Sequence, residues 1–84
     1  MTQLLDPPAA VEVELDEAGE PRHVGGSPFA GPARALLRWI VEVDWWTSEP
    51  VSRECWLLVL RDELMCEVYR DRGSGAWYVE RVYD

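Results

Sequence analysis

The chain has 84 residues, which is enough for one small domain and too few for two. Sixteen acidic side chains against eight arginines, with no lysine, give a net charge of −8. This charge repels phosphate backbones at long range and argues against non-specific binding to nucleic acid. A hydrophobic content of 48% that includes five tryptophans is sufficient for one core.

The sequence contains no recognisable targeting or membrane-spanning segment. The opening "MTQLLDPPAA" lacks the basic region and the long apolar run of a signal peptide, and no apolar stretch approaches about 18 residues. We therefore expect a cytoplasmic protein. Cys55 and Cys66 lie in apolar stretches, and in a reducing compartment we expect buried free thiols rather than a disulfide.

The first third of the chain predicts an arm and one clear strand. Residues 1–10 contain the Pro7–Pro8 pair and are expected to form a flexible N-terminal arm, followed by a single small β domain over residues 11–84. "VEVEL" (Val11 to Leu15) alternates apolar and acidic side chains, as a half-buried strand does. Residues 22–32, which are rich in Gly and Pro, are expected to form a loop or an irregular edge.

The next segment allows two interpretations. "ARALLRW" (Ala33 to Trp39) consists of good helix formers, which favours one helical turn or a short helix near 33–38. "RWIVEVDWW" (Arg38 to Trp46) instead alternates with period two and is rich in β-branched and aromatic residues. We expect a strand over Leu37–Trp45 and leave the helical turn open as the alternative.

The second half predicts a central strand and a terminal hairpin. Arg53–Leu60 is a nearly continuous apolar run, as expected of a strand covered on both faces, and Leu64–Arg70 is its antiparallel partner. The glycine-bearing segment "DRGSGA" then leads into a last strand, Trp77–Tyr83. The fold class is therefore mostly β: a small antiparallel meander of about five strands that curls into a bent sheet or a small barrel.

The alternation also predicts which side chains form the core. In the last strand it puts Trp77, Val79 and Tyr83 on the core face, and Val82 on the opposite face. The residues expected to be buried are Val11, Val13, Trp39, Val41, Leu58, Val68 and Val79.

No arrangement of residues predicts catalysis, a cofactor or a metal. His23 is the only histidine, and no nucleophile motif lies near it. Glu12 and Glu14 share a strand face, which is more typical of a solvated surface than of a metal pair. We expect a protein that is not an enzyme and needs no cofactor.

The aromatic residues are the one feature that points to binding. Trp45 and Trp46 are adjacent, so on a strand they face opposite sides, and so do Trp77 and Tyr78. One member of each pair then serves the core, while the other is exposed or covers a second small cluster. The candidate interaction residues are Trp46, Arg53 and Tyr78, because aromatics beside arginines anchor protein partners or stack on single-stranded bases.

Four stretches, taken together, resemble a known family. They are "VEVELDEAGEP", "EVDWW", "SRECWLL" and "CEVYRDRGSGAWYVERVYD", of which Tyr69 to Asp84 is the most specific. The pattern is similar to a bacterial domain family of unknown function, found as short stand-alone proteins and at the C-terminal end of ImuB-like Y-family polymerase homologues. The match covers about 70 of the 84 residues.

The resemblance implies a non-catalytic accessory or docking module linked to DNA-damage tolerance by translesion synthesis. Its partner is then a protein, either a Y-family polymerase or an accessory subunit. A single-stranded nucleic-acid-binding barrel is the alternative, which the net charge disfavours. The chain departs from the family at "HVGGSPFAGPARALL" (His23 to Leu37), which lacks the Trp and the paired arginines of that strand, so any basic contact surface there is not carried over.

Overall fold

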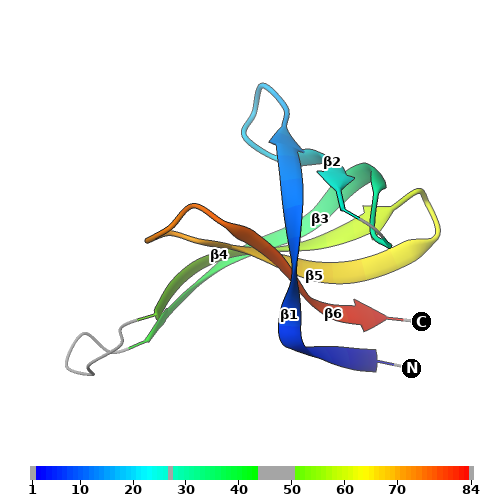
Figure 1. Ribbon diagram of the computed structural model, residues 1–84. Helices are drawn as coiled ribbons and strands as arrows, with labels where there is room; N and C mark the ends of the chain where they lie inside the picture. The colour runs from blue at the N-terminus through cyan, green and yellow to red at the C-terminus, as the bar shows by residue number, and fades with distance from the viewer. Residues whose placement is uncertain (1, 27, 44–50, 84) are drawn as a thin grey trace.

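The chain folds into a ring of antiparallel strands (Figure 1). The computed structural model describes residues 2–26, 28–43 and 51–83. Within these residues the chain forms six strands and no helix, and hence no helix that could cross a bilayer. The predicted antiparallel meander is confirmed, with one strand more than expected. The strands are β1 (Thr2–Leu15), β2 (Pro21–Gly25), β3 (Gly31–Val43), β4 (Val51–Leu60), β5 (Leu64–Asp71) and β6 (Trp77–Tyr83).

Each strand pairs with the next and β6 returns to β1, so the sheet closes on itself. The ring is not a regular barrel, because the two longest strands change partners along their length. β1 pairs with β6 over residues 2–11 and with β2 over residues 12–15. β3 pairs with β2 only at Gly31 and Pro32, whereas its pairing with β4 runs over residues 33–43. In Figure 1, β3 and β4 accordingly extend side by side well beyond β2.

The N-terminal residues differ from the predicted flexible arm. Residues 2–10 belong to β1, and both Thr2–Leu4 and Ala9–Val11 pair with β6. Pro7 and Pro8 have no N–H to donate, and the register of the ladder shifts between Leu4 and Ala9. The proline pair thus interrupts the pairing of β1 without ending the strand.

The helical turn considered near 33–38 does not form, because these residues lie in β3. Helix propensities differ by only tenths of a kcal/mol per residue, whereas β4 offers a complete row of backbone partners. Ala35 lies opposite Leu58, and pairing resumes at Leu37. Leu36 is therefore an extra residue, a β-bulge, that resets the alternation of side chains along β3.

The core lies on the inner face of β4, β5 and β6 and is completed by β2 and the segment before β3. Its buried members are Val24, Phe29, Trp56, Leu58, Leu60, Cys66, Val68, Val79 and Val82. Three of the seven residues predicted to be buried are among them, namely Leu58, Val68 and Val79. The other four lie on β1 and β3, whose pairing is incomplete, and they are only half-buried: Val11, Val13, Trp39 and Val41.

The face of β6 that packs on the core changes along the strand. β5 pairs with β6 at Val79 and again at Arg81, so Glu80 is an extra residue. The bulge brings Val82 into the core and moves Tyr83 to the opposite face by alternation. The prediction that Tyr83 joins Val79 in the core, with Val82 on the other face, is therefore wrong.

The start of β3 depends on a glycine. Gly31 has a φ of +151°, and a Cβ at this position would lie 2.5 Å from Cγ of Arg61. Arg61, in the turn between β4 and β5, donates its backbone N–H to the carbonyl of Pro32 at 2.9 Å and its Nη1 to the carbonyl of Ala30 at 3.4 Å. Residue 31 therefore lets two distant segments approach closely.

Candidate functional site

The sheet formed by β3 to β6 buries side chains on the face opposite the core as well. Cys55 and Tyr69 are both buried, yet neither belongs to the core cluster. Cys55 adjoins Trp56, which faces the core, so alternation directs Cys55 to the other face. There it lies opposite Tyr69 in the pairing of β4 with β5. This outer face therefore carries a second small cluster.

Three side chains from neighbouring strands stack on the outer face. The guanidinium carbon of Arg53 lies 4.2 Å from the ring centroid of Tyr69. The rings of Tyr69 and Tyr78 are 5.2 Å apart with an interplanar angle of 28°. Glu80 places its Oε1 3.7 Å from Nη1 of Arg53. We call Arg53, Tyr69, Tyr78 and Glu80 the outer cluster. The ring of Tyr69 and the carboxylate of Glu80 hold the Arg53 side chain in place.

A pocket of about 290 Å³ adjoins the outer cluster. Its apolar lining comes from Trp39, Val41, Cys55 and Val68, and Arg53 and Glu80 of the outer cluster also line it. A second ion pair in the lining joins Arg81 of β6 to Glu67 of β5 at 3.5 Å. This volume is at the lower end of the range for small-molecule sites, and it suits a side chain of a partner.

The pKa values of two buried groups on this face, Cys55 and Tyr69, are shifted toward the neutral form. Burial raises the pKa of the Cys55 thiol, and the negative charge of Glu80 raises it further while Arg53 lowers it. Burial likewise raises the pKa of Tyr69. A neutral, buried thiol is a poor nucleophile at physiological pH. Cys55 and Tyr69 are therefore suited to packing and contact rather than to proton or group transfer.

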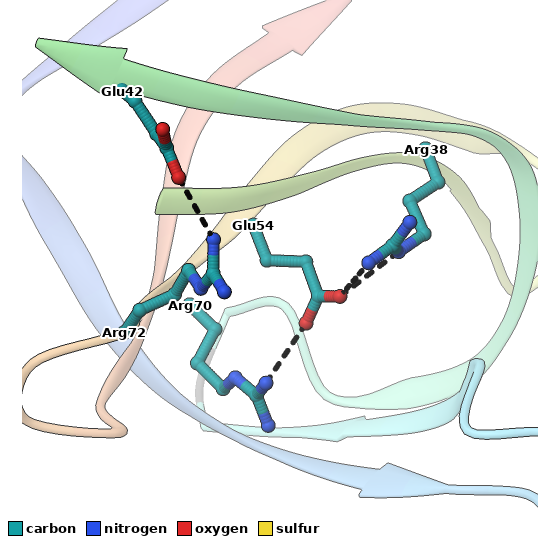
Figure 2. A network of polar contacts seen from close by, with 5 residues as sticks. All are labelled: Arg38, Glu42, Glu54, Arg70 and Arg72. Carbon is teal, nitrogen blue, oxygen red and sulfur yellow. Dashed lines mark hydrogen bonds and ion pairs between the residues drawn. The ribbon is translucent and has the colours of Figure 1, made fainter. Parts of the chain in front are cut away.

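A polar network lies on the core side of the same strands (Figure 2). Arg38 of β3 donates Nε, at 2.9 Å, and Nη2 to Oε2 of Glu54, while Nη2 of Arg70 lies 3.0 Å from Oε1. The Glu54 side chain is only 13% exposed, so these charge-assisted bonds are partly shielded from water. Both carboxylate oxygens are occupied, and Glu54 therefore joins β3, β4 and β5.

The two arginines of this network also contact the tryptophans at the end of the core. Arg38 lies 5.8 Å from the ring centroid of Trp56, and Arg70 lies 5.7 Å from that of Trp77. The two indole rings are 5.0 Å apart and tilted by 34°. Cation–π contacts of this kind favour the ordered position of both partners. This cluster stabilises the sheet beneath the outer face.

The groups considered for catalysis do not converge. His23 is exposed on β2, and Glu12 and Glu14 are exposed on β1. Glu14 forms an exposed ion pair with Arg22 at 3.7 Å. Over the described part of the chain, no three His, Cys, Asp or Glu side chains lie close enough to hold a metal ion.

Two of the three predicted interaction residues come together in the structure. Arg53 and Tyr78 both contact Tyr69, whereas Trp46, like Trp45, lies outside the described residues. Tyr69 was not predicted as a member of the site, although alternation from Val68 directs it to the outer face. Its contact with Arg53 depends on the register of β4 and β5, which no local pattern encodes.

Comparison with known proteins does not assign a function to this site. No protein-family model matches the chain, and no curated protein or solved structure matches it either.

Proposed function

We propose that the protein is a non-catalytic protein-interaction module whose contact surface is the outer cluster and its pocket. The stack of Arg53, Tyr69 and Tyr78 beside a pocket carries this proposal. Tyrosine, tryptophan and arginine are the residues enriched at the energetic centres of protein interfaces. Arg53 is already held by Tyr69 and Glu80, so a partner would lose little affinity to ordering it.

The partner class that we propose follows from the resemblance alone. The stretch Tyr69 to Asp84 is similar to the terminal domain of ImuB-like Y-family polymerase homologues. We therefore propose a Y-family polymerase or an accessory subunit of translesion synthesis as the partner.

A single-stranded nucleic-acid binder is the second candidate. One observation favours it: a guanidinium and two aromatic rings lie on one face, as in proteins that stack unpaired bases. The net charge of −8 opposes it, and so do the carboxylates of Glu67 and Glu80 beside the arginines.

Binding measurements with matched variants test the protein-interaction proposal. With a purified ImuB-like polymerase homologue as the probe, we expect Tyr78→Ala and Arg53→Ala each to weaken binding at least about tenfold, as truncation of an interface centre does. Tyr83→Ala and Arg22→Ala, which change the same residue types outside the outer cluster, should bind as the unmodified chain does. Equal affinities for all four variants would contradict the proposed surface.

Salt dependence separates the two candidates. A complex with a single-stranded oligonucleotide should weaken steeply as salt rises, with a slope of about −0.7 per phosphate contact in a plot of log affinity against log salt. A contact made by aromatic and apolar groups should change little. Tight oligonucleotide binding that is lost both in salt and in Tyr78→Ala would establish the second candidate instead.

A further inference from the structure

β3 has a long outer edge that pairs with no other described strand. Over residues 34–43, β3 pairs with β4 on one side, and no described strand pairs with it on the other. Such an edge presents backbone N–H and C=O groups that can accept a further strand. Large apolar side chains lie along it, including Leu36, Leu37 at 61% exposed and Ile40 at 41% exposed.

β1 is the other long strand that pairs on one side only over part of its length, and its prolines hinder the addition of a further strand. β3 has no such protection along its outer edge. Pro7 and Pro8 lie in the part of β1 that pairs with β6 alone, and proline prevents continuous pairing along an edge. In β3 the only proline is Pro32, which is already paired with β2. Residues 33–43 contain no proline and no lysine, the residues that proteins commonly use to prevent edge-to-edge pairing.

We propose that this edge is a homodimer interface in which β3 pairs antiparallel with β3 of a second copy about a two-fold axis at Ile40. In this register Ile40 lies opposite Ile40, Trp39 opposite Val41, and Arg38 opposite Glu42. Apolar pairs and opposite charges that face each other directly stabilise antiparallel strands. A two-fold interface requires this kind of self-complementary surface.

The charges select this register among the symmetric alternatives. Two-fold symmetry allows only registers centred on a residue, because directly opposed side chains must share a face. An axis at Arg38 or at Glu42 places that charge opposite its own copy. An axis at Trp39 or at Val41 places Ile40 opposite a charged side chain. Over residues 37–43, the axis at Ile40 alone pairs opposite charges and leaves no charge opposite a like charge or an apolar side chain, which favours a second copy over an unrelated strand.

The pairs across the axis are compatible with the contacts inside each chain. Arg38 uses Nε and Nη2 for Glu54, and a guanidinium has further N–H donors. Glu42 receives Nη1 of Arg72 at Oε1, at 3.2 Å, which leaves Oε2 as a second acceptor (Figure 2). The proposed dimer therefore extends this network across the axis and disrupts none of these contacts.

Sedimentation equilibrium with paired variants tests the interface. The unmodified chain should dimerise in a concentration-dependent manner, and Ile40→Lys should weaken dimerisation at least tenfold by placing two ammonium groups at the axis. Met65→Lys is the matched control, because Met65 is exposed to 39% but lies on β5, which pairs on both sides. It should dimerise as the unmodified chain does. A chain that is monomeric up to its solubility limit, or an Ile40→Lys variant that associates undiminished, would overturn the proposal.

Disulfide trapping provides a second test that does not depend on how Ile40→Lys folds. Directly opposed residues have Cβ atoms about 4.5–5.5 Å apart, so Ile40→Cys should form a covalent dimer under mild oxidation. Glu42→Cys alone should not, but it should link to Arg38→Cys when the two variants are mixed. The unmodified chain, whose Cys55 and Cys66 are buried, is the control. Rapid self-linking of Glu42→Cys without linking of Ile40→Cys would rule out this register.

Discussion

Cys66 is a side chain whose acidity is set by its position in the core. Burial raises the pKa of its thiol from 9.0 to about 11. Between these two pH values the folded state retains a proton that the unfolded chain releases. The stability gained from keeping this thiol neutral in the folded state is complete below pH 9.0. It is lost as the pH rises toward about 11, a decline of roughly 2–3 kcal/mol in the free energy of unfolding.

Chemical denaturation across that pH range measures the decline. Cys66→Ala should be less stable at neutral pH, because it leaves a small cavity. Its stability should nevertheless fall less steeply above pH 9.0 than that of the unmodified chain, since the titrating group is gone. An equally steep decline in the variant would assign the effect to other groups, such as Cys55 and Tyr69, whose pKa values are also raised by burial.

The sequence predicted which single residues are suited to contacts better than it predicted which residues lie next to them in space. Arg53 and Tyr78 could be selected as contact residues because of their residue types and their places in predicted strands. Their common contact, Tyr69, depends on how β5 aligns with β4 and β6. The exchange of Val82 for Tyr83 in the core has a similar origin, because one unpaired residue reverses an alternation that is otherwise strict.

At the level of elements, the start of β3 is held by the close approach of Gly31 to Arg61. Gly31→Ala should cost about 1–3 kcal/mol in the free energy of unfolding, because a Cβ would displace the Arg61 side chain and because the φ of +151° is unfavourable for alanine. Thermal or urea denaturation measures the loss.

Gly25→Ala is the control for this substitution. Its added Cβ would meet the nearest atom, Cβ of Glu12, at 3.6 Å, which is an ordinary contact, and the backbone of Gly25 is not in the positive-φ region. It should change stability by less than about 1 kcal/mol. Similar losses for both variants would show that the approach to Arg61 does not determine the stability of this corner.

The strands themselves were predictable where their pattern was periodic. Alternation over Val11–Leu15 and the apolar run over Arg53–Leu60 both lie within observed strands. The sequence pattern did not predict the strand segments that form because a distant segment pairs with them. Residues 2–10 have no distinct strand pattern but find a partner in β6, and residues 33–38 have helix formers but find a partner in β4. Long-range pairing therefore outweighed local preference in both segments.

For the whole molecule, β6 is the strand that closes the ring. It pairs with β5 on one side and with β1 on the other, and it supplies Val79 and Val82 to the core. A chain truncated after Gly75 should therefore lose its cooperative thermal transition, because two ladders and part of the core are removed together. Circular dichroism during heating measures this.

Tyr78→Ala is the control for the truncation. Its side chain lies on the outer face, so the variant should keep a cooperative transition with a modest loss of stability. If the truncated chain also keeps a cooperative transition and loses only its binding partner, β6 serves docking rather than closure.

The pairing of β1 with β6 also determines the order in which the ring can assemble. The β3–β4, β4–β5 and β5–β6 pairs join neighbours in sequence, and hairpins of this kind form within microseconds. The ladder that sets Thr2 opposite Tyr83 can form only when the two ends of the chain meet, so we expect its loop closure to be the slow step of folding. A short peptide joining these ends would turn this ladder into a local hairpin. A circular permutant opened in the turn at residues 16–20 would have the shorter β1–β2 ladder as its end-to-end pairing instead, so it should reach the same fold faster.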